Sequence, residues 1–267
     1  MLNLVANKNI MMSYAVCCVP VAPVRIEPDH RAEMTSQLLF GECCIVTDAE
    51  KTGWVKIVNQ YDAYSGWCSQ SHFQEIDEVT YYSEETDLAA DWVNEIDFNG
   101  QLMRIPFGSS LTGVKKGEAL WCQNKLQYAG NLWKPVGAKH DAETIKQLAF
   151  MFFNTVYLWG GRSVFGTDCS GLTQSVYKFL NISLLRDAQQ QATQGEMVGF
   201  LQEARCGDLA FFDNEDGNII HTGILLDATA IIHAAGRVRV DKIDNAGIID
   251  AETGQRLQRL RVIKRYL

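Results

Sequence analysis

The sequence lacks a long uninterrupted apolar run. No segment approaches the roughly 18 consecutive apolar residues that a membrane-spanning helix needs, so we expect no membrane span. The N-terminal stretch MLNLVANKNIMMSYAVCCVPVAPV also lacks a basic region followed by a long apolar region, the pattern of a secretory signal peptide. We therefore expect a cytoplasmic protein, with an exported form as the alternative.

Runs of basic residues are missing as well. The formal net charge is −8 and is spread over both halves of the chain, so nothing in it attracts nucleic acid or an anionic membrane surface. With 47% hydrophobic and 21% charged residues, the chain is not of the disordered class. Its 267 residues suffice for a sizeable core and for two or three domains.

The sequence contains eight cysteines but no arrangement of them that is typical of a metal site. The pairs at 17–18 and 43–44 are directly adjacent, unlike C-x-x-C, and no Cys/His cluster completes a zinc site. We interpret all cysteines except Cys169 as buried reduced thiols, which fits a reducing compartment. We expect neither a metal nor an organic cofactor.

Short apolar segments separated by turn residues fill the first half of the chain. The segments VAPVRIEP, LLFGECCIVTDA and GWVKIVNQYDAYSGWCSQ are rich in β-branched and aromatic residues and predict the strands of a small barrel. After TYYSEETD, a second set follows in QLMRIPFGSSL, GVKKGEALWC and KLQYAGNLWKPV. We predict two small β-units in tandem, at residues 1–78 and 79–137.

The pattern changes after VGAKH. The segment DAETIKQLAFMFFNTVYLWGG predicts a helix, because an Asp and an early Glu precede apolar residues at helical spacing, and Gly-Gly follows. CSGLTQSVYKFL predicts a second helix that begins at or near Cys169 and buries Leu172, Val176, Phe179 and Leu180. GDLAFFDN, HTGILLDAT and AIIHAAG indicate strands. Helices followed by an antiparallel sheet predict an α+β domain over residues 138–267.

Cys169, in the segment GTDCSGL, stands where this second helix is expected to begin. Unpaired backbone N–H groups and the positive end of the helix dipole stabilise an anion there. We therefore expect the pKa of the thiol to fall below its usual value of about 8.5 and Cys169 to act as a nucleophile.

A nucleophile needs a base, and the chain has only five histidines. His221 and His233 lie on consecutive predicted strands, whose antiparallel pairing would bring the two rings side by side. Taken alone, either histidine is more often a core or surface residue. Together with the cysteine, they predict a nucleophilic site.

The run YLWGGRSVFGTDCSGL, followed by LLRDAQQQA, GDLAFF, IIHTGILL and IIHAAG, resembles the NlpC-type cell-wall cysteine peptidases over about residues 138–267. The resemblance implies a papain-like fold in which Cys169 is the nucleophile and His221 is the general base that later protonates the leaving amine. It implies that His233 orients His221. Tyr157 matches a tyrosine whose hydroxyl helps the Cys169 N–H hold the tetrahedral oxyanion. Without the resemblance, Tyr157 is equally well interpreted as a core ring on a helix.

Two residues depart from the pattern of these peptidases. Arg162 stands where a small or polar residue is common after Gly-Gly, which would alter the pocket wall. Ala188 follows Asp187 where related sequences often have Ser, which would remove one hydroxyl contact.

The first half resembles the tandem bacterial SH3-like domains that precede this domain in γ-D-glutamyl-L-diamino-acid endopeptidases. EPDHRAEMTSQLLFGE and YDAYSGWCS carry this likeness, whereas only the strand pattern supports it over residues 79–137. The expected architecture is an α+β papain-like catalytic domain preceded by two small all-β SH3-like barrels.

This resemblance implies murein stem peptides as substrates, with cleavage between γ-D-Glu and the diamino acid and a free N-terminal L-Ala. A buried ammonium group needs a carboxylate and hydrogen-bond acceptors around it. The residues that match contacts to this amino group are Asp187 and Tyr64, with Tyr61 a competing choice for the latter, Glu33 a further candidate, and Asp168 and Ser170 flanking the pocket. The alternatives are that Asp187 only caps a helix and that Tyr64 only fills the barrel surface.

Two other functions compete with this hypothesis. The first is a cell-wall peptide-binding module whose catalytic domain is inert. The second is an acyltransferase or amidase that uses the same fold. The intact set of Cys169, His221 and His233 argues against an inert domain, because such a domain need not keep all three.

Overall fold

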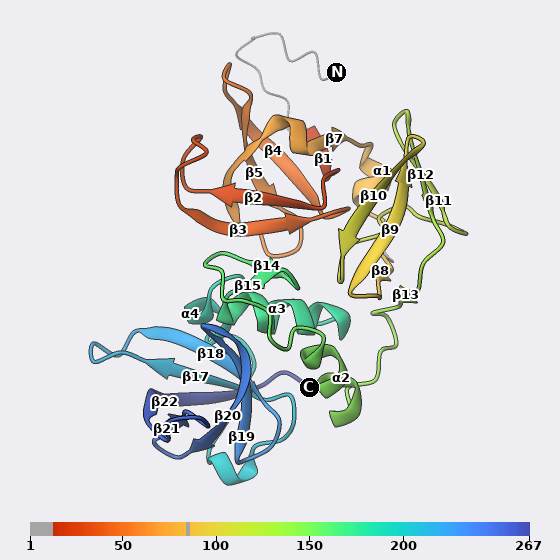
Figure 1. Cartoon of the computed structure of the whole chain (residues 1–267). Coiled ribbons are helices and arrows are strands. Elements are labelled where there is room, and N and C mark those ends of the chain that lie inside the picture. The colour runs from red at the N-terminus through yellow and green to blue at the C-terminus, as the bar shows by residue number, and fades with distance from the viewer. Residues whose placement is uncertain (1–12, 84–85) are drawn as a thin grey trace. The chain divides into compact units, whose positions relative to one another are not determined.

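The structure, a computed structural model, describes residues 13–83 and 86–267 (Figure 1). The N-terminal stretch that lacks signal-peptide features lies partly outside these residues. The chain divides into two compact units, one ending at Val136 and the other beginning at Gly137. Within the described residues, no helix combines the length and apolar character needed to cross a membrane.

The first unit contains a curled, seven-stranded antiparallel sheet in the order β3-β2-β6-β5-β4-β1-β7. Alternate residues face its core, as in β2, where Ala22 and Val24 are buried and their neighbours are half-buried. The strands are β1 (Ser13–Cys17), β2 (Val21–Arg25), β3 (Met34–Leu39), β4 (Cys43–Ala49), β5 (Trp54–Asn59), β6 (Ser65–Ser69) and β7 (Phe73–Glu75), with a short 3₁₀ turn η1 (Gln70–His72) before β7.

The rest of the first unit is a four-stranded sheet in the order β10-β9-β12-β11 and a two-stranded sheet of β13 and β8. The elements are α1 (Glu78–Tyr81), β8 (Leu88–Ala89), β9 (Val93–Phe98), β10 (Gln101–Pro106), β11 (Glu118–Trp121), β12 (Asn124–Tyr128) and β13 (Leu132–Trp133).

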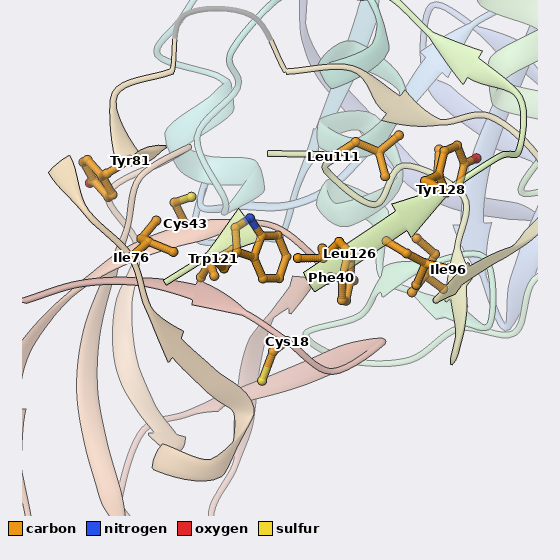
Figure 2. Close-up of a cluster of buried hydrophobic side chains, with 13 residues drawn as sticks. Cys18, Phe40, Cys43, Ile76, Tyr81, Ile96, Leu111, Trp121, Leu126 and Tyr128 are labelled. Carbon is orange, nitrogen blue, oxygen red and sulfur yellow. The ribbon is translucent and has the colours of Figure 1, made fainter. Parts of the chain in front are cut away.

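These smaller sheets share one hydrophobic core with the seven-stranded sheet. Figure 2 shows Trp121 and Leu126 beside Phe40, and the ring centroids of Phe40 and Trp121 are 5.2 Å apart. At Gly41, which has a positive φ of 77°, an added Cβ would overlap the Ser110 carbonyl oxygen, so only glycine allows this approach. Residues 79–137 therefore do not form a distinct second barrel, because their apolar side chains pack on the first sheet instead of closing around a core of their own.

The second unit is built on an antiparallel sheet in the order β16-β22-β17-β18-β19-β20-β21, and β21 pairs back with β22. The strands from β22 through β21 thus close a six-stranded barrel, and β16 extends it at β22. The strands are β16 (Glu196–Val198), β17 (Leu209–Asp213), β18 (Ile219–Leu225), β19 (Ala230–Ala235), β20 (Arg237–Asp244), β21 (Gly247–Ile249) and β22 (Arg256–Arg265). A cluster that includes Phe212, Leu225 and Ile248 fills its core.

Helices and short elements complete this unit: α2 (Ala142–Phe150), β14 (Arg162–Ser163), β15 (Gly166–Thr167), α3 (Cys169–Phe179), α4 (Ala188–Gln191) and η2 (Leu201–Glu203). Helix α3 packs against β18 and β19. The prediction that a helix begins at Cys169 is confirmed, and all four residues of its predicted apolar face are buried.

The helix predicted before Gly160 is shorter than expected, since α2 ends at Phe150. Asn154 has a left-handed backbone with φ of 65°, and its N–H donates to the Val238 carbonyl. The Val238 N–H in turn donates to the Thr155 carbonyl. The chain therefore leaves the helix to run beside β20, and Tyr157 lies on extended backbone rather than on a helix.

The cysteines differ in burial. Those of the first seven-stranded sheet are buried, as expected, but Cys122 is exposed and Cys206 is half-buried, so the expectation is wrong for these two. All eight are free thiols, and they lie within the described part of the chain.

Candidate active site

Asp168 fixes the start of helix α3. Its Oδ1 accepts a hydrogen bond from the Gly171 N–H at 2.6 Å, and its Oδ2 accepts one from the Gly160 N–H at 2.8 Å. A Cβ on Gly171 would overlap the carbonyl oxygen of Gly161, so a glycine lets the helix approach this turn closely. The cap and the close approach hold the turn that carries Cys169 in one conformation.

Arg186 forms a buried ion pair with the same carboxylate. Its guanidinium contacts Asp168 Oδ1 at 3.1 Å and Oδ2 at 2.6 Å, and it donates to Ser170 Oγ at 3.0 Å. The side chains of Arg186 and Asp168 are only 1% and 7% exposed. Asp168 and Ser170, which the sequence places beside a substrate pocket, are thus engaged with Arg186. Arg186 was not predicted from the sequence, although it directly precedes the candidate Asp187.

Cys169 is the first residue of α3 and is 7% exposed. Burial, assisted by the charge of Asp168, raises the pKa of the thiol to about 12. The backbone N–H groups of Thr222 and Ser170 and the charge of Arg186 act in the opposite direction without outweighing burial. The expected lowering of this pKa is therefore wrong: the helix end is favourable, but the loss of water around the sulfur has the larger effect.

His221 on β18 and His233 on β19 lie side by side, which confirms the expected pairing of their strands. His221 Nε2 and His233 Nδ1 are 2.8 Å apart, and the ring centroids are 5.1 Å apart. His233 Nε2 lies 2.9 Å from Oδ2 of Asp241 on β20, and both of these side chains are fully buried. Asp241 was not predicted from the sequence. In the segment RVRVDKID, it falls on the same face of the strand as Arg237 and Arg239, which indicates a polar face.

The two ends of this row of hydrogen bonds have different charges. Burial, together with the His233 ring, lowers the pKa of His221 to about 3, so the imidazole is neutral near pH 7. Burial raises the pKa of Asp241, but hydrogen bonds from His233 and the Ala251 N–H, with the charge of Arg239, bring it below its usual value. Asp241 is therefore ionised. Near pH 7, the thiol of Cys169 and the imidazole of His221 are therefore both uncharged.

Tyr157 reaches the same place from the segment before the β14–β15 hairpin. Its N–H donates to the Gly236 carbonyl at 2.9 Å, which ties it to the turn between β19 and β20. Burial, with the nearby Cys169 and Asp168, raises the pKa of its hydroxyl to about 12. The hydroxyl thus stays protonated and can donate a hydrogen bond to an oxyanion.

Asp187 stands at the N-cap of α4 with a half-buried side chain, and its N–H donates to Gln190 Oε1 at 3.1 Å. This position agrees with the alternative that Asp187 only caps a helix. Contact of Asp187 with the amino group of the peptide stays a prediction. Ala188, the next residue, is buried. Arg162 is also buried, on β14, and its carbonyl accepts from Ser175 Oγ at 3.0 Å.

The remaining candidates belong to the first unit. Tyr64 precedes β6, and its N–H donates to Asp62 Oδ1 at 3.0 Å, while Tyr61 lies in the same loop. Glu33 is exposed just before β3. Binding of the peptide substrate by Tyr64, Tyr61 or Glu33 stays a prediction. Within residues 13–83 and 86–267, no group of three or more His, Cys, Asp or Glu side chains is arranged to hold a metal ion.

Both units of the chain contain a segment that matches a known protein family. Residues 154–256 match the NlpC/P60 family, and residues 24–73 match the bacterial dipeptidyl-peptidase Sh3 domain. The chain is 30% identical over 216 residues to the gamma-D-glutamyl-L-lysine dipeptidyl-peptidase of Bacillus subtilis (strain 168), covering 74% of this chain and 71% of that protein. The chain belongs to the NlpC/P60 family.

Other relatives match over more of the chain. Dipeptidyl-peptidase 6 of Lysinibacillus sphaericus is 24% identical, covering 86% of this chain and 92% of that protein. A crystal structure of an NlpC/P60 family protein from Bacillus cereus has a TM-score of 0.80 at 20% identity, covering 96% of this chain and all of that chain. The last likeness concerns the fold. The resemblance to NlpC-type peptidases with an SH3-like N-terminal region is confirmed.

Proposed function

We propose that this chain is a cysteine peptidase that hydrolyses the bond between γ-D-Glu and the diamino acid of murein stem peptides with a free N-terminal L-Ala. The observation that carries the proposal is the hydrogen-bonded pair of His221 and His233 next to Thr222, whose backbone N–H lies near the buried thiol of Cys169, in a chain of the NlpC/P60 family. A relative at 30% identity bears the name gamma-D-glutamyl-L-lysine dipeptidyl-peptidase, which supports this bond and this end of the peptide. The proposed setting is the cytoplasm, where such peptides are recycled.

The proposed reaction begins with a neutral thiol. His221 takes the proton of Cys169 Sγ as the sulfur attacks the carbonyl carbon of γ-D-Glu. The Tyr157 hydroxyl and the Cys169 N–H donate to the oxyanion. His221 then gives its proton to the leaving amine of the diamino acid, and a thioester remains on Cys169. Water, deprotonated by His221, attacks the thioester carbon. The C–S bond then breaks, L-Ala-γ-D-Glu is released, and the proton on His221 returns to the Cys169 sulfur.

The free amino group of the peptide is proposed to meet the Asp187 carboxylate, with Tyr64 and Glu33 as further contacts. A buried ammonium group without a carboxylate partner is costly, so a blocked end should be rejected. Asp168 and Ser170 support this subsite through Arg186, which directly precedes Asp187 and contacts both of them.

Mass spectrometry of purified protein incubated with L-Ala-γ-D-Glu-L-Lys or L-Ala-γ-D-Glu-diaminopimelate tests the proposal. We expect the dipeptide L-Ala-γ-D-Glu to appear, and neither the Cys169→Ala variant nor the N-acetylated peptide to yield it. Binding without cleavage would favour the inert binding module, and transfer of the acyl group to an added amine would favour the acyltransferase. Efficient cutting of intact, glycan-linked murein would contradict the need for a free L-Ala.

A further inference from the structure

A buried carboxylate, Asp241, ends the row of hydrogen bonds that begins at His221. Its Oδ2 faces His233 Nε2 at 2.9 Å, and its Oδ1 is 2.8 Å from Arg239 Nη2 and 2.9 Å from the Ala251 N–H. Both oxygens of Asp241 are therefore held by donors. Charge compensation comes from Arg239, which also contacts Asp250 Oδ1 at 3.2 Å and is only 14% exposed.

The direction of each hydrogen bond follows from this end of the row. An ionised carboxylate can only accept, so Nε2 of His233 carries a proton. With a single proton on the His233 ring, Nδ1 is then an acceptor, and it faces His221 Nε2 at 2.8 Å. His221 Nε2 must therefore carry the proton of its own ring. Nδ1 is the ring nitrogen of His221 that remains able to accept a proton.

We propose that Asp241 is a positioning residue that, through His233, keeps the proton of His221 on Nε2 and so leaves Nδ1 as the base for Cys169. This inference rests on the proposed cysteine peptidase chemistry. It assigns to Asp241 no contact with substrate. It adds Asp241 as a fourth side chain to Cys169, His221 and His233, with Arg239 and the Ala251 N–H holding the carboxylate in its orientation.

An asparagine at position 241 would reverse every bond in the row. Two donors, Arg239 and the Ala251 N–H, surround the place of Oδ1, so the amide oxygen must take that place. The amide NH₂ group then faces His233 Nε2, which has to become an acceptor. His233 carries its proton on Nδ1 and donates to His221 Nε2, and His221 is left with its proton on Nδ1, where the base is needed.

The expected loss in Asp241→Asn is therefore large although the side chain keeps its size. A wrong tautomer of the base in a comparable hydrolytic site lowers kcat on the order of 10⁴-fold, and we expect a fall of about 10³- to 10⁴-fold here. KM should change little, because Asp241 lies behind His233. Asp244→Asn is the matched control: it makes the same change on the same strand, and Asp244 pairs with Arg256 at a half-exposed site.

The test combines kinetics with ¹⁵N nuclear magnetic resonance of histidine-labelled protein, in which the two neutral tautomers have different nitrogen shifts. The chain has five histidines, and His221→Gln and His233→Asn variants assign the two rings. In the wild type, we expect both His221 and His233 to carry the proton on Nε2. In Asp241→Asn, both should carry it on Nδ1, with kcat reduced as above, while Asp244→Asn keeps wild-type tautomers and rates.

A proton on Nδ1 of His221 in the wild type would overturn the inference, as would wild-type kcat or unchanged tautomers in a folded Asp241→Asn variant. The wild-type spectrum decides the matter even if Asp241→Asn fails to fold. The spectrum needs no substrate. Expected tautomers in a wild-type protein that does not cleave the peptide would therefore support the positioning role and contradict the proposed function.

Discussion

Replacing Arg186 with methionine would leave the Asp168 carboxylate buried without its counter-charge. Both side chains are almost completely buried, and two short contacts of 2.6 and 3.1 Å join them. Removing one partner of such a pair typically costs about 3–5 kcal/mol, because the remaining charge cannot be hydrated. We expect the free energy of unfolding of the second unit to fall by this amount, and its Tm to fall by roughly 10–20 °C.

A double variant separates the ion pair from the loss of packing. Asparagine caps helices about as well as aspartate, so Asp168→Asn should keep much of the cap while it removes the charge. We expect Arg186→Met combined with Asp168→Asn to be more stable than Arg186→Met alone by about 1–3 kcal/mol, in the range of coupling between contacting residues.

Chemical denaturation followed by circular dichroism measures both effects. Arg256→Met serves as the control, because Arg256 and its partner Asp244 are 44% and 46% exposed and an exposed pair contributes less than about 1 kcal/mol. An Arg186→Met variant that loses no more stability than Arg256→Met would refute the reasoning.

Four further outcomes follow from the site. Cys169→Ala should abolish hydrolysis, His221→Ala should nearly abolish it, and His233→Ala should have a milder effect. The double variant of Cys169→Ala and His221→Ala should be little worse than either single variant, because the two residues act as a unit. Additive losses in the double variant would contradict this. Because burial raises the pKa of Cys169 to about 12, its alkylation by iodoacetamide should keep rising with pH above the usual thiol range, and a plateau near pH 7 would contradict the neutral thiol. The folded pKa of His221 is about 3 against an ordinary value of 6.5, so the unfolded chain binds a proton first as the pH falls. Stability should therefore decrease from pH 6.5 toward pH 3, on the order of a few kcal/mol, and His221→Gln should flatten this part of the stability curve. Asp187→Ala or N-acetylation of the peptide should each lower kcat/KM by on the order of 10²-fold, whereas equal rates for free and acetylated peptides would remove Asp187 from the subsite.

Local sequence patterns predicted the parts of the site that depend on one element at a time. The apolar spacing in CSGLTQSVYKFL placed the start of α3 at or near Cys169, and two consecutive apolar strands placed His221 beside His233. These features depend on capping and on pairing between neighbouring strands, which short segments specify.

Features that depend on distant segments were not predictable in this way. The ion pair of Asp168 with Arg186 and the contact of His233 with Asp241 form only when the chain has folded. The direction of the pKa shift of Cys169 also depends on burial by the whole unit. The end of α2 depends on pairing with β20, and the shared core at Phe40 depends on the smaller sheet of the first unit.

Rapid quenching of the reaction with L-Ala-γ-D-Glu-L-Lys, followed by mass spectrometry of the digested protein, tests the central proposal most directly. If the reaction passes through a thioester, the L-Ala-γ-D-Glu acyl group must appear on the digestion fragment that contains Cys169. It must form at a rate no slower than the release of the dipeptide. We expect that adduct in the wild type and its absence in Cys169→Ala. An acyl group on another residue, or dipeptide released by Cys169→Ala at the wild-type rate, would contradict the account.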